Sequence, residues 1–432
     1  MTRFEPAGPL RGSVRPPADK SISHRAALFG AMSDMPVAIR NYLYAEDTLS
    51  TLDVLRALGA GVDLQPEELV IRGVGLRQPL MTTNEMVDVG NAGTLMRLLP
   101  GWLAGQAGGR WTLDGDASIR RRPVDRIAEP LRAMGAEVET AEGGRPPFTV
   151  AGADLDGIDW TSKVASAQVK SCVLIAGLLA AGSTSFTEPS QSRDHTERIL
   201  LRSRVPFERD GLTVRVAATD ELELDDVVVP GDPSSAAFFV TAAAIVPGSR
   251  IVVDGVGLNW TRTAFFRIAA RMGAVVIGDT EEPGTASGEE PVGELDVAQA
   301  PLLGTVVEGD EVPLAIDELP LVALLGVFAE GETVIRGAGE LRVKETDRIA
   351  GVADGLRGLG AEVEATGDGL VVQGTGSLRG GRFDARGDHR LAMLGAIAGV
   401  ASLEGVEVEG MEAAAVSYPA FEDDLRALVT SA

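Results

Sequence analysis

The chain is poor in the residues that cross-link small secreted proteins or bind soft metals. Its 432 residues include one cysteine, Cys172, and three histidines. A single cysteine excludes a disulfide framework and a zinc site built on cysteines, and no His-Glu-x-x-His pattern occurs. The longest apolar runs, such as 236–246, are too short to span a bilayer, and residues 1–13 lack the apolar core of a signal peptide. We therefore expect a protein of a reducing, aqueous compartment.

Basic residues are also scarce relative to acidic ones. The chain has 39 Lys and Arg against 63 Asp and Glu, a formal net charge of −24. Such a charge argues against nucleic acids and anionic membranes as partners, because both are repelled at long range. Exposed charges more than about 10 Å apart are largely screened at moderate salt. A local cluster of cations is therefore still able to bind a small phosphorylated molecule.

Lysine is rare, and most lysines lie in compact polar motifs. The four are Lys20, Lys163, Lys170 and Lys344. The histidines also lie beside charged residues: His24, His195 and His389. For each histidine, a turn organised by local hydrogen bonds is the alternative to a catalytic role. We expect Lys20, Lys170 and Lys344 to line one binding cleft together with selected arginines.

A short pattern, Leu-Arg-Ala-Leu-Gly-Ala and weaker copies of it, recurs six times. Its glycine falls at residues 59, 135, 273 and 360, and residues 204 and 429 stand at the same place in the two weaker copies. Apolar residues at i, i+4 and i+7, such as Ile127, Leu131 and Met134, predict an amphipathic helix. The glycine that follows supplies the left-handed conformation that ends a helix, and a short alternating strand comes next. The chain is therefore predicted to contain six α/β units.

The length favours two or three domains, and six units divide naturally into two domains of three. The predicted hinge is 229–233, where Asp232 and Pro233 fit the N-cap and first position of a helix. A cleft between two such domains is a favoured ligand site. The longest spacing between repeats contains segment 278–296, with seven acidic residues and no basic one. We expect this segment to be a solvated loop without a catalytic role.

Several units place small or polar residues just before an apolar helix, at 20–21, 90–97, 166–168 and 388–390. Free backbone amides at a helix start, with a neighbouring Lys or Arg, make an anion pocket. Helix caps use the same residue types, so it is the recurrence in related repeats that favours an anion-binding cleft. Arginine suits bidentate recognition of carboxylate and phosphate. The candidate arginines are Arg25, Arg122, Arg193, Arg348 and Arg390.

Two further features concern charged side chains near these motifs. Of the consecutive arginines 120–122, we expect one to face the cleft and two to face water. Asp317 and Glu345 lie among cations in the sequence, which favours the ionised form that accepts a proton. The alternative for both carboxylates is a structural ion pair.

Together these motifs resemble the 5-enolpyruvylshikimate-3-phosphate synthases of the enolpyruvyl transferase family. The resemblance rests on segments 19–25, 90–94, 122–123, 166–171, 193–197, 231–235, 317–318, 342–348 and 388–390. It implies a two-lobed, inside-out α/β barrel of six βαβαββ units, three per lobe. The C-terminal lobe would comprise residues 1–13 and 231–432, the N-terminal lobe residues 14–230, and the active site would lie in the cleft between the lobes.

The resemblance also implies a reaction. The enolpyruvyl group of phosphoenolpyruvate is transferred to the 5-hydroxyl of shikimate 3-phosphate through a tetrahedral intermediate, with release of phosphate, in the pathway to chorismate and aromatic amino acids. It implies a cytoplasmic monomer that needs no metal or organic cofactor. Gly93 stands where an alanine in some members hinders the herbicide glyphosate, so we predict inhibition by glyphosate in competition with phosphoenolpyruvate.

Residue roles follow from the matched motifs. The implied catalytic residues are Lys20, Asp317 and Glu345. The implied shikimate 3-phosphate ligands are Lys20, Ser21, Arg25, Ser166, Gln168, Arg193, Asp317 and Lys344. The implied phosphoenolpyruvate ligands are Lys20, Asn91, Gly93, Thr94, Arg122, Gln168, Arg348 and Arg390.

Two other functions remain open on the sequence. The related enolpyruvyl transferase that acts on UDP-N-acetylglucosamine usually has Lys-Asn where this chain has Lys20-Ser21, and a cysteine in a mobile loop. Cys172 instead lies in an apolar helical run, as a small buried residue would. The second alternative is a non-catalytic repeat protein that binds an anionic metabolite, in which Asp317 and Glu345 are structural.

Overall fold

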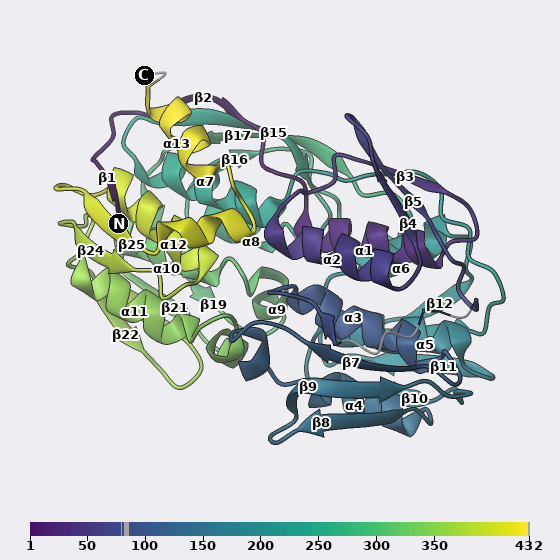
Figure 1. Ribbon diagram of the computed structural model, residues 1–432. Helices are drawn as coiled ribbons and strands as arrows, with labels where there is room; N and C mark the ends of the chain where they lie inside the picture. The colour runs from purple at the N-terminus through teal and green to yellow at the C-terminus, as the bar shows by residue number, and fades with distance from the viewer. Residues whose placement is uncertain (79, 82–85, 431–432) are drawn as a thin grey trace. The chain divides into compact units, whose positions relative to one another are not determined.

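The computed structural model describes residues 1–78, 80–81 and 86–430. The chain divides into two compact units (Figure 1). Unit 1 comprises Met1–Pro17, Pro230–Thr285 and Pro291–Ala432, and unit 2 comprises Ala18–Val229 and Ala286–Glu290. Each unit is an α/β structure with three related sheets.

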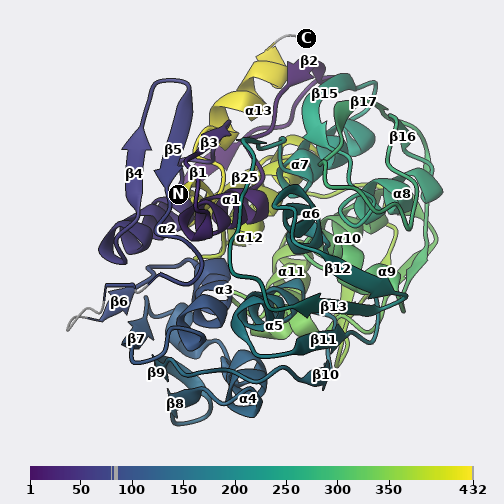
Figure 2. The same cartoon turned by 90° about the vertical axis from the view of Figure 1, so that its right-hand side faces the viewer.

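The three sheets of unit 2 have the same topology, with orders β14-β3-β5-β4, β6-β7-β9-β8 and β10-β11-β13-β12. In each, the first pair of strands is parallel and the other two pairs are antiparallel. Figure 2 shows the β4–β5 hairpin of the first sheet clearly. The strands are β3 (Val37–Arg40), β4 (Gly61–Leu64), β5 (Glu68–Arg72), β6 (Val87–Asp88), β7 (Arg110–Asp114), β8 (Glu137–Ala141), β9 (Arg145–Ala151), β10 (Asp159–Thr161), β11 (Ser183–Thr187), β12 (Phe207–Asp210), β13 (Thr213–Ala217) and β14 (Val227–Val228).

The sheets of unit 1 repeat this pattern, with orders β2-β15-β17-β16 and β19-β21-β23-β22, a three-stranded sheet β24-β25-β1, and a small pair β18-β20. Strands β1 and β2 come from the start of the chain, yet they pair with β25 and β15 (Figure 1). The strands are β1 (Thr2–Phe4), β2 (Arg11–Val14), β15 (Arg250–Gly257), β16 (Val275–Ile277), β17 (Val292–Ala298), β18 (Leu302–Leu303), β19 (Val306–Val307), β20 (Ala329–Glu330), β21 (Glu332–Ile335), β22 (Glu362–Ala365), β23 (Leu370–Gln373), β24 (Gly381–Asp384) and β25 (Val406–Glu409).

Two kinds of helix pack on these sheets. The inner helices are buried on nearly every side and form the core of each unit. They are α1 (Lys20–Met32), α3 (Gly93–Ala104) and α5 (Ala167–Leu179) in unit 2, and α7 (Pro233–Ile245), α10 (Leu319–Phe328) and α12 (His389–Val400) in unit 1. In unit 1 these three helices contact one another, and in unit 2 α3 contacts both α1 and α5.

Each helix of the second kind ends close to the glycine of the sequence repeat, or close to the residue that takes its place. These helices are α2 (Glu46–Ala57), α4 (Asp125–Ala133), α6 (His195–Arg202), α8 (Ala264–Arg271), α11 (Arg348–Gly358) and α13 (Phe421–Thr430). The first five contact the strand that follows them in the chain. The shorter helical segments are α9 (Glu311–Ala315), η1 (Ile119–Arg121), η2 (Gly339–Val343) and η3 (Met411–Val416).

The predicted helix ends are confirmed by the backbone. Gly135 and Gly273 follow α4 and α8 with φ values of 106° and 109°, a left-handed region that glycine enters without a steric penalty. In the third repeat Arg204 takes the same place with φ of 56°. The predicted fold class, six α/β repeats in two groups of three, is therefore confirmed.

The prediction for segment 278–296 is wrong in its second half. Residues 292–296 belong to strand β17, with Leu295 fully buried, and residues 286–290 belong to unit 2. Glu294 and Asp296 alternate with Leu295 and Val297, so the acidic side chains lie on the face of the strand away from the core. The prediction failed because the many acidic residues of this segment indicated a loop, although two of them alternate with buried residues of a strand.

Candidate active site

The polar cluster of unit 1 is built around Arg348, the first residue of α11. Its side chain is 1% exposed. Nε lies 2.8 Å from Oδ2 of Asp388, and Nη2 lies 2.6 Å from Oε2 of Glu345. Nη1 lies 3.2 Å from Oδ1 of Asp317. Three carboxylates therefore surround one buried guanidinium.

These contacts decide the charge states at the centre of the cluster. Burial alone would lower the pKa of Arg348, but the three carboxylates outweigh it and raise the pKa above its ordinary value. Burial alone would likewise raise the pKa of Asp388, but the charge of Arg348 outweighs it and the pKa is lowered. Arg348 is thus a fixed cation and Asp388 a fixed anion.

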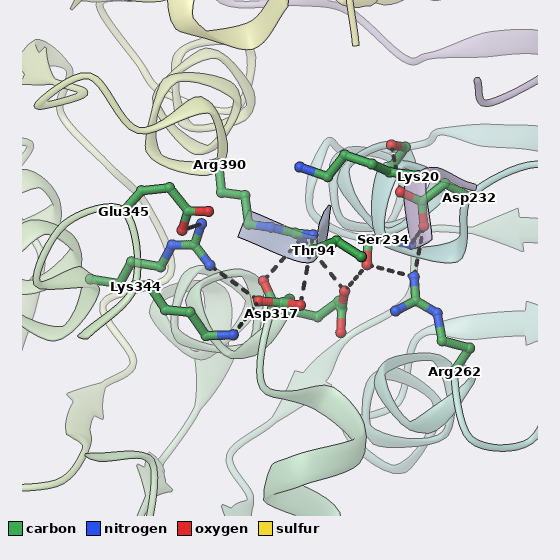
Figure 3. Close-up of polar contacts among 12 residues, drawn as sticks. Lys20, Thr94, Asp232, Ser234, Arg262, Asp317, Lys344, Glu345 and Arg390 are labelled. Atoms are coloured by element: carbon green, nitrogen blue, oxygen red, sulfur yellow. Dashed lines mark hydrogen bonds and ion pairs between the residues drawn. The ribbon is translucent and has the colours of Figure 1, made fainter. Parts of the chain in front are cut away.

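Two further cations, Lys344 and Arg390, lie near Asp317 (Figure 3). Nζ of Lys344 lies 3.1 Å from its Oδ1. Nη1 of Arg390 donates to its backbone oxygen at 3.3 Å, and Nη2 lies 4.0 Å from its Oδ2. Asp388 caps α12 by accepting from the backbone N–H of Arg390 at 2.8 Å, and this contact fixes the backbone position from which the Arg390 side chain extends. The structure thus brings together five predicted site residues: Asp317, Lys344, Glu345, Arg348 and Arg390.

The first cluster of unit 2 surrounds Arg25 of α1, which is 2% exposed. Its guanidinium donates to Oγ1 of Thr196 at 2.9 Å and to Oγ of Ser171 at 3.0 Å. It also donates to the backbone oxygen of Ser21 at 3.1 Å. Burial lowers the pKa of Arg25 to about 10, and the nearby positive charge of Arg193 adds to this effect. Arg25 is therefore still a cation at neutral pH, held by neutral partners.

Lys20 opens α1 and has a partner that the sequence did not indicate. Its Nζ lies 2.8 Å from Oδ2 of Asp47, whose side chain is 5% exposed. Asp47 lies in the first turn of α2, 27 residues later. Because the ammonium is part-exposed and the carboxylate is buried, Asp47 fixes the end of a flexible side chain.

The start of α3 carries a second group of predicted residues. Nε2 of Gln168 donates to Oγ1 of Thr94 at 3.1 Å, and Oε1 of Gln168 accepts from Arg97 at 2.8 Å. A Cβ atom at Gly93 would overlap Nη1 of Arg122. The absence of a side chain at Gly93 is therefore what lets the arginine lie against the first turn of the helix.

The remaining predicted residues of unit 2 lie close to helix starts. Asn91 donates to Oδ2 of Asp116 at 2.6 Å just before α3. Ser166 caps α5 by accepting from the N–H of Val169. Arg193 lies two residues before α6 and is half-buried. Arg122 is 8% exposed whereas its two neighbours, 120 and 121, are exposed, in line with the expectation that two of the three arginines face water.

The expectation that Lys170 lines a binding cleft is wrong. Its side chain is 1% exposed, and Nζ lies 3.0 Å from Glu188 and 2.6 Å from Glu197. Burial alone would lower the pKa of Lys170, but the two glutamates outweigh it and raise the pKa. The two glutamates lie 18 and 27 residues later in the chain, so sequence neighbours do not indicate that this lysine is enclosed. Lys170 is structural.

The histidines and the cysteine are also buried. Nδ1 of His24 lies 2.7 Å from Oγ1 of Thr51, and burial lowers the pKa of His24 to about 3, so its ring is neutral. Burial raises the pKa of Cys172. Within residues 1–78, 80–81 and 86–430, no group of three or more His, Cys, Asp or Glu side chains is placed to hold a metal ion. Over the same residues, no helix has the length and apolar character needed to cross a membrane.

Two units of three βαβαββ repeats, with arginines and lysines gathered at helix starts, define the enolpyruvyl transferase fold. The solved structure of the enolpyruvyl transferase NikO from Streptomyces tendae matches this chain with a TM-score of 0.79 at 18% identity, covering 99% of this chain and 96% of that chain. That likeness shows the fold alone.

Relatives with higher sequence identity show to which family of enolpyruvyl transferases the chain belongs. The solved structure of EPSP synthase from Acinetobacter baumannii is 38% identical, with a TM-score of 0.85 and coverage of 99% of this chain and 98% of that chain. A 3-phosphoshikimate 1-carboxyvinyltransferase of Thermus thermophilus is 48% identical over 98% of this chain and 97% of the relative. The model of the family described as EPSP synthase (3-phosphoshikimate 1-carboxyvinyltransferase) matches residues 4–425. The chain belongs to this family of transferases.

Proposed function

We propose that the protein transfers the enolpyruvyl group of phosphoenolpyruvate to the 5-hydroxyl of shikimate 3-phosphate. The products are 5-enolpyruvylshikimate 3-phosphate and phosphate. Family membership over nearly the whole chain supports the reaction. The single observation that carries it is Asp317, a carboxylate in contact with Lys344 and Arg348, where a base and anion-binding groups lie together.

The proposed shikimate 3-phosphate ligands are eight residues. Lys20, Ser21, Arg25, Ser166, Gln168 and Arg193 belong to unit 2, and Asp317 and Lys344 belong to unit 1. Arg25 supports this role because its hydrogen-bond partners in the described part of the chain are hydroxyl groups and a backbone oxygen, while the carboxylates of Asp19, Glu197 and Glu290 act on it only through longer-range attraction. A phosphate or carboxylate next to it would complete the charge balance.

The proposed phosphoenolpyruvate ligands are Lys20, Asn91, Gly93, Thr94, Arg122 and Gln168 of unit 2 and Arg348 and Arg390 of unit 1. Backbone amides at the start of α3 favour an anion there, because they have no partner within the helix. The cations supply fixed positive charge where the phosphate oxygens gain negative charge as phosphate leaves.

The chemistry is an addition followed by an elimination. Asp317 accepts the proton of the 5-hydroxyl as its oxygen forms a bond to C2 of phosphoenolpyruvate, while Lys20 or Glu345 delivers a proton to C3. The tetrahedral adduct then loses phosphate as a proton leaves C3, which restores the double bond. Acceptance of a proton suits Asp317, because Lys344 and Arg348 favour its ionised form.

The decisive experiment measures phosphate release. Release with shikimate 3-phosphate and phosphoenolpyruvate is expected, and release with UDP-N-acetylglucosamine in place of shikimate 3-phosphate would instead favour the related transferase. Asp317→Asn should lower kcat about a hundredfold or more, the usual contribution of a general base. Asp354→Asn is the matched control, because Asp354 lies on α11 in exposed pairs with Arg357 and Arg386. Normal turnover by Asp317→Asn would contradict the base assignment.

We further propose that the protein acts as a cytoplasmic monomer on these small molecules alone. The large negative net charge supports the absence of nucleic-acid and membrane partners, since both are anionic. Sedimentation analysis and fractionation of cells test the two statements. A stable dimer, or recovery of the protein in the membrane fraction, would contradict them.

A further inference from the structure

Glu318 follows Asp317 directly, and the proposed chemistry gives it no role. It is 3% exposed and precedes the first residue of α10. Asp232 and Ser234, from the motif at the start of α7, are also buried and have no assigned role. Buried ionisable groups are costly unless they are paired, so their arrangement calls for a reason.

These residues form one continuous path to Arg390 (Figure 3). Nη2 of Arg262 lies 2.7 Å from Oδ1 of Asp232 and 2.9 Å from Oγ of Ser234. Oγ of Ser234 donates a hydrogen bond to Oε1 of Glu318. Nη1 of Arg390 lies 3.6 Å from the same Oε1. The path therefore links the first turn of α7 to the first turn of α12.

The donors and acceptors along this path can be assigned. Ser234 accepts from Arg262, so its single hydroxyl proton is free to point at Glu318. Oε1 of Glu318 accepts this hydrogen bond and also faces the guanidinium of Arg390. The same oxygen is therefore held from two sides, by the Ser234 hydroxyl and by the Arg390 guanidinium.

The anchor of the path is rigid. Oδ1 of Asp232 accepts from the backbone N–H of Ser234 at 2.9 Å and from Arg262, so the cap of α7 and the ion pair hold the same atom. Side chains on helix starts, locked by buried contacts, hold a geometry better than free surface groups do. Glu318 is thus fixed by neighbours that have no role in the chemistry.

We infer that Glu318, held by Ser234 and the Asp232–Arg262 pair, is a positioning residue for Arg390. It holds the guanidinium by its charge and draws it away from the Asp317 carboxylate, which lies 4.0 Å from Nη2 of Arg390. Two functions follow: Arg390 is pre-oriented for the carboxylate or phosphate of its substrate, and Asp317 is kept available as a base. The inference rests on the proposed assignment of Arg390 to phosphoenolpyruvate.

The test compares the KM values of the two substrates. Glu318→Gln keeps the shape and still accepts from Ser234, but it removes the charge that faces Arg390. We expect the KM for phosphoenolpyruvate to rise about tenfold, the effect of losing one charge-assisted contact, with the KM for shikimate 3-phosphate changed less than twofold. Ser234→Ala should raise the same KM by a smaller factor, about threefold, because Glu318 keeps its charge but loses its anchor.

Ser235→Ala is the matched control. Ser235 is equally buried and adjacent, but it donates to Oδ2 of Asp232 at 3.3 Å rather than to Glu318. Its KM values and melting temperature should stay close to those of the unmodified protein. For Glu318→Gln, a lower melting temperature with both KM values unchanged would show that Glu318 is only structural. A rise of both KM values by the same factor would show the same, and either result would overturn the inference.

Two further outcomes separate this inference from the proposed function. If Arg390→Gln leaves the KM for phosphoenolpyruvate unchanged, the assignment of Arg390 fails. If Arg390→Gln raises that KM but Glu318→Gln does not, only the positioning role fails. Should Glu318→Gln not fold, the ratio of the two KM values in Ser234→Ala decides, and an unchanged ratio overturns the inference.

Discussion

Nδ1 of His195 lies 2.6 Å from Oε1 of Glu290, a residue 95 positions later in the chain. His195 is the buried first residue of α6, and Glu290 ends the short segment 286–290 that belongs to unit 2. The backbone oxygen of Glu289 accepts from Arg198 of the same helix at 2.5 Å. A segment inserted between two strands of unit 1 therefore holds the start of α6, two residues after Arg193.

The first prediction concerns this contact. Glu290→Gln removes the carboxylate next to His195 while keeping the size of the side chain. We expect the free energy of unfolding to fall by about 1–2 kcal/mol, because a hydrogen bond to a charged group contributes about 1.5–3 kcal/mol and the neutral one that glutamine can still make contributes about 0.5–1.5 kcal/mol. Urea denaturation followed by circular dichroism measures it.

Glu289→Gln is the control for Glu290→Gln. The Glu289 side chain is 79% exposed and pairs with Arg202. Exposed ion pairs contribute little, so its effect should stay within about 0.5 kcal/mol. Equal effects of the two variants would show that the contact with His195 does not stabilise α6.

The second prediction concerns the enclosed ammonium of Lys170. Lys170→Met leaves Glu188 and Glu197 buried without their cation, and breaking one side of a buried pair costs about 3–5 kcal/mol. The loss appears as a lower denaturation midpoint. Lys163→Met is the control, since Lys163 is exposed and its replacement should change stability by less than about 0.5 kcal/mol. A loss below about 1 kcal/mol for Lys170→Met would contradict the structural role.

The repeat pattern, unlike these contacts, could be predicted from the sequence. A helix end is decided by residues within one turn of it, so Gly135 and Gly273 indicated where α4 and α8 stop. Asp232 and Pro233 indicated the start of α7 for the same reason. The local sequence pattern was therefore enough to predict the six units and the fold class.

The partners of the charged residues could not be predicted in this way. Asp47 reaches Lys20 from another helix, and Glu197 reaches Lys170 across a strand and a turn. Charge alone does not distinguish an enclosed lysine from one that binds substrate, which is why Lys170 was misassigned. Only the packing of α5 against its neighbours shows which side chains are buried.

The third prediction concerns the start of α3. A Cβ atom introduced by Gly93→Ala would overlap Nη1 of Arg122, so the guanidinium must move. We expect the KM for phosphoenolpyruvate to rise about tenfold, the effect of about 1.4 kcal/mol of lost binding, and inhibition by glyphosate to weaken by at least as much. Gly8→Ala is the control, because a Cβ there meets nothing within 4 Å. An unchanged KM in Gly93→Ala would remove Arg122 from the proposed phosphoenolpyruvate ligands.

The last prediction concerns pH and His24. Burial lowers the pKa of His24 to about 3, whereas a histidine in the unfolded chain titrates near 6.5. Between these values the unfolded chain binds a proton that the folded protein does not, so stability is full above about pH 6.5 and is lost as the pH falls. The loss is up to about 1.4 kcal/mol per pH unit, or about 2 kcal/mol at pH 5.

His24→Gln isolates this contribution, since every other titrating group is common to both proteins. Between pH 7 and pH 5 the variant should lose about 2 kcal/mol less stability than the unmodified protein. Its stability at pH 7 reports separately on the contact with Thr51, which glutamine is able to replace in part. Parallel curves of unfolding free energy against pH would mean that His24 takes up its proton in the folded protein as readily as in the unfolded chain.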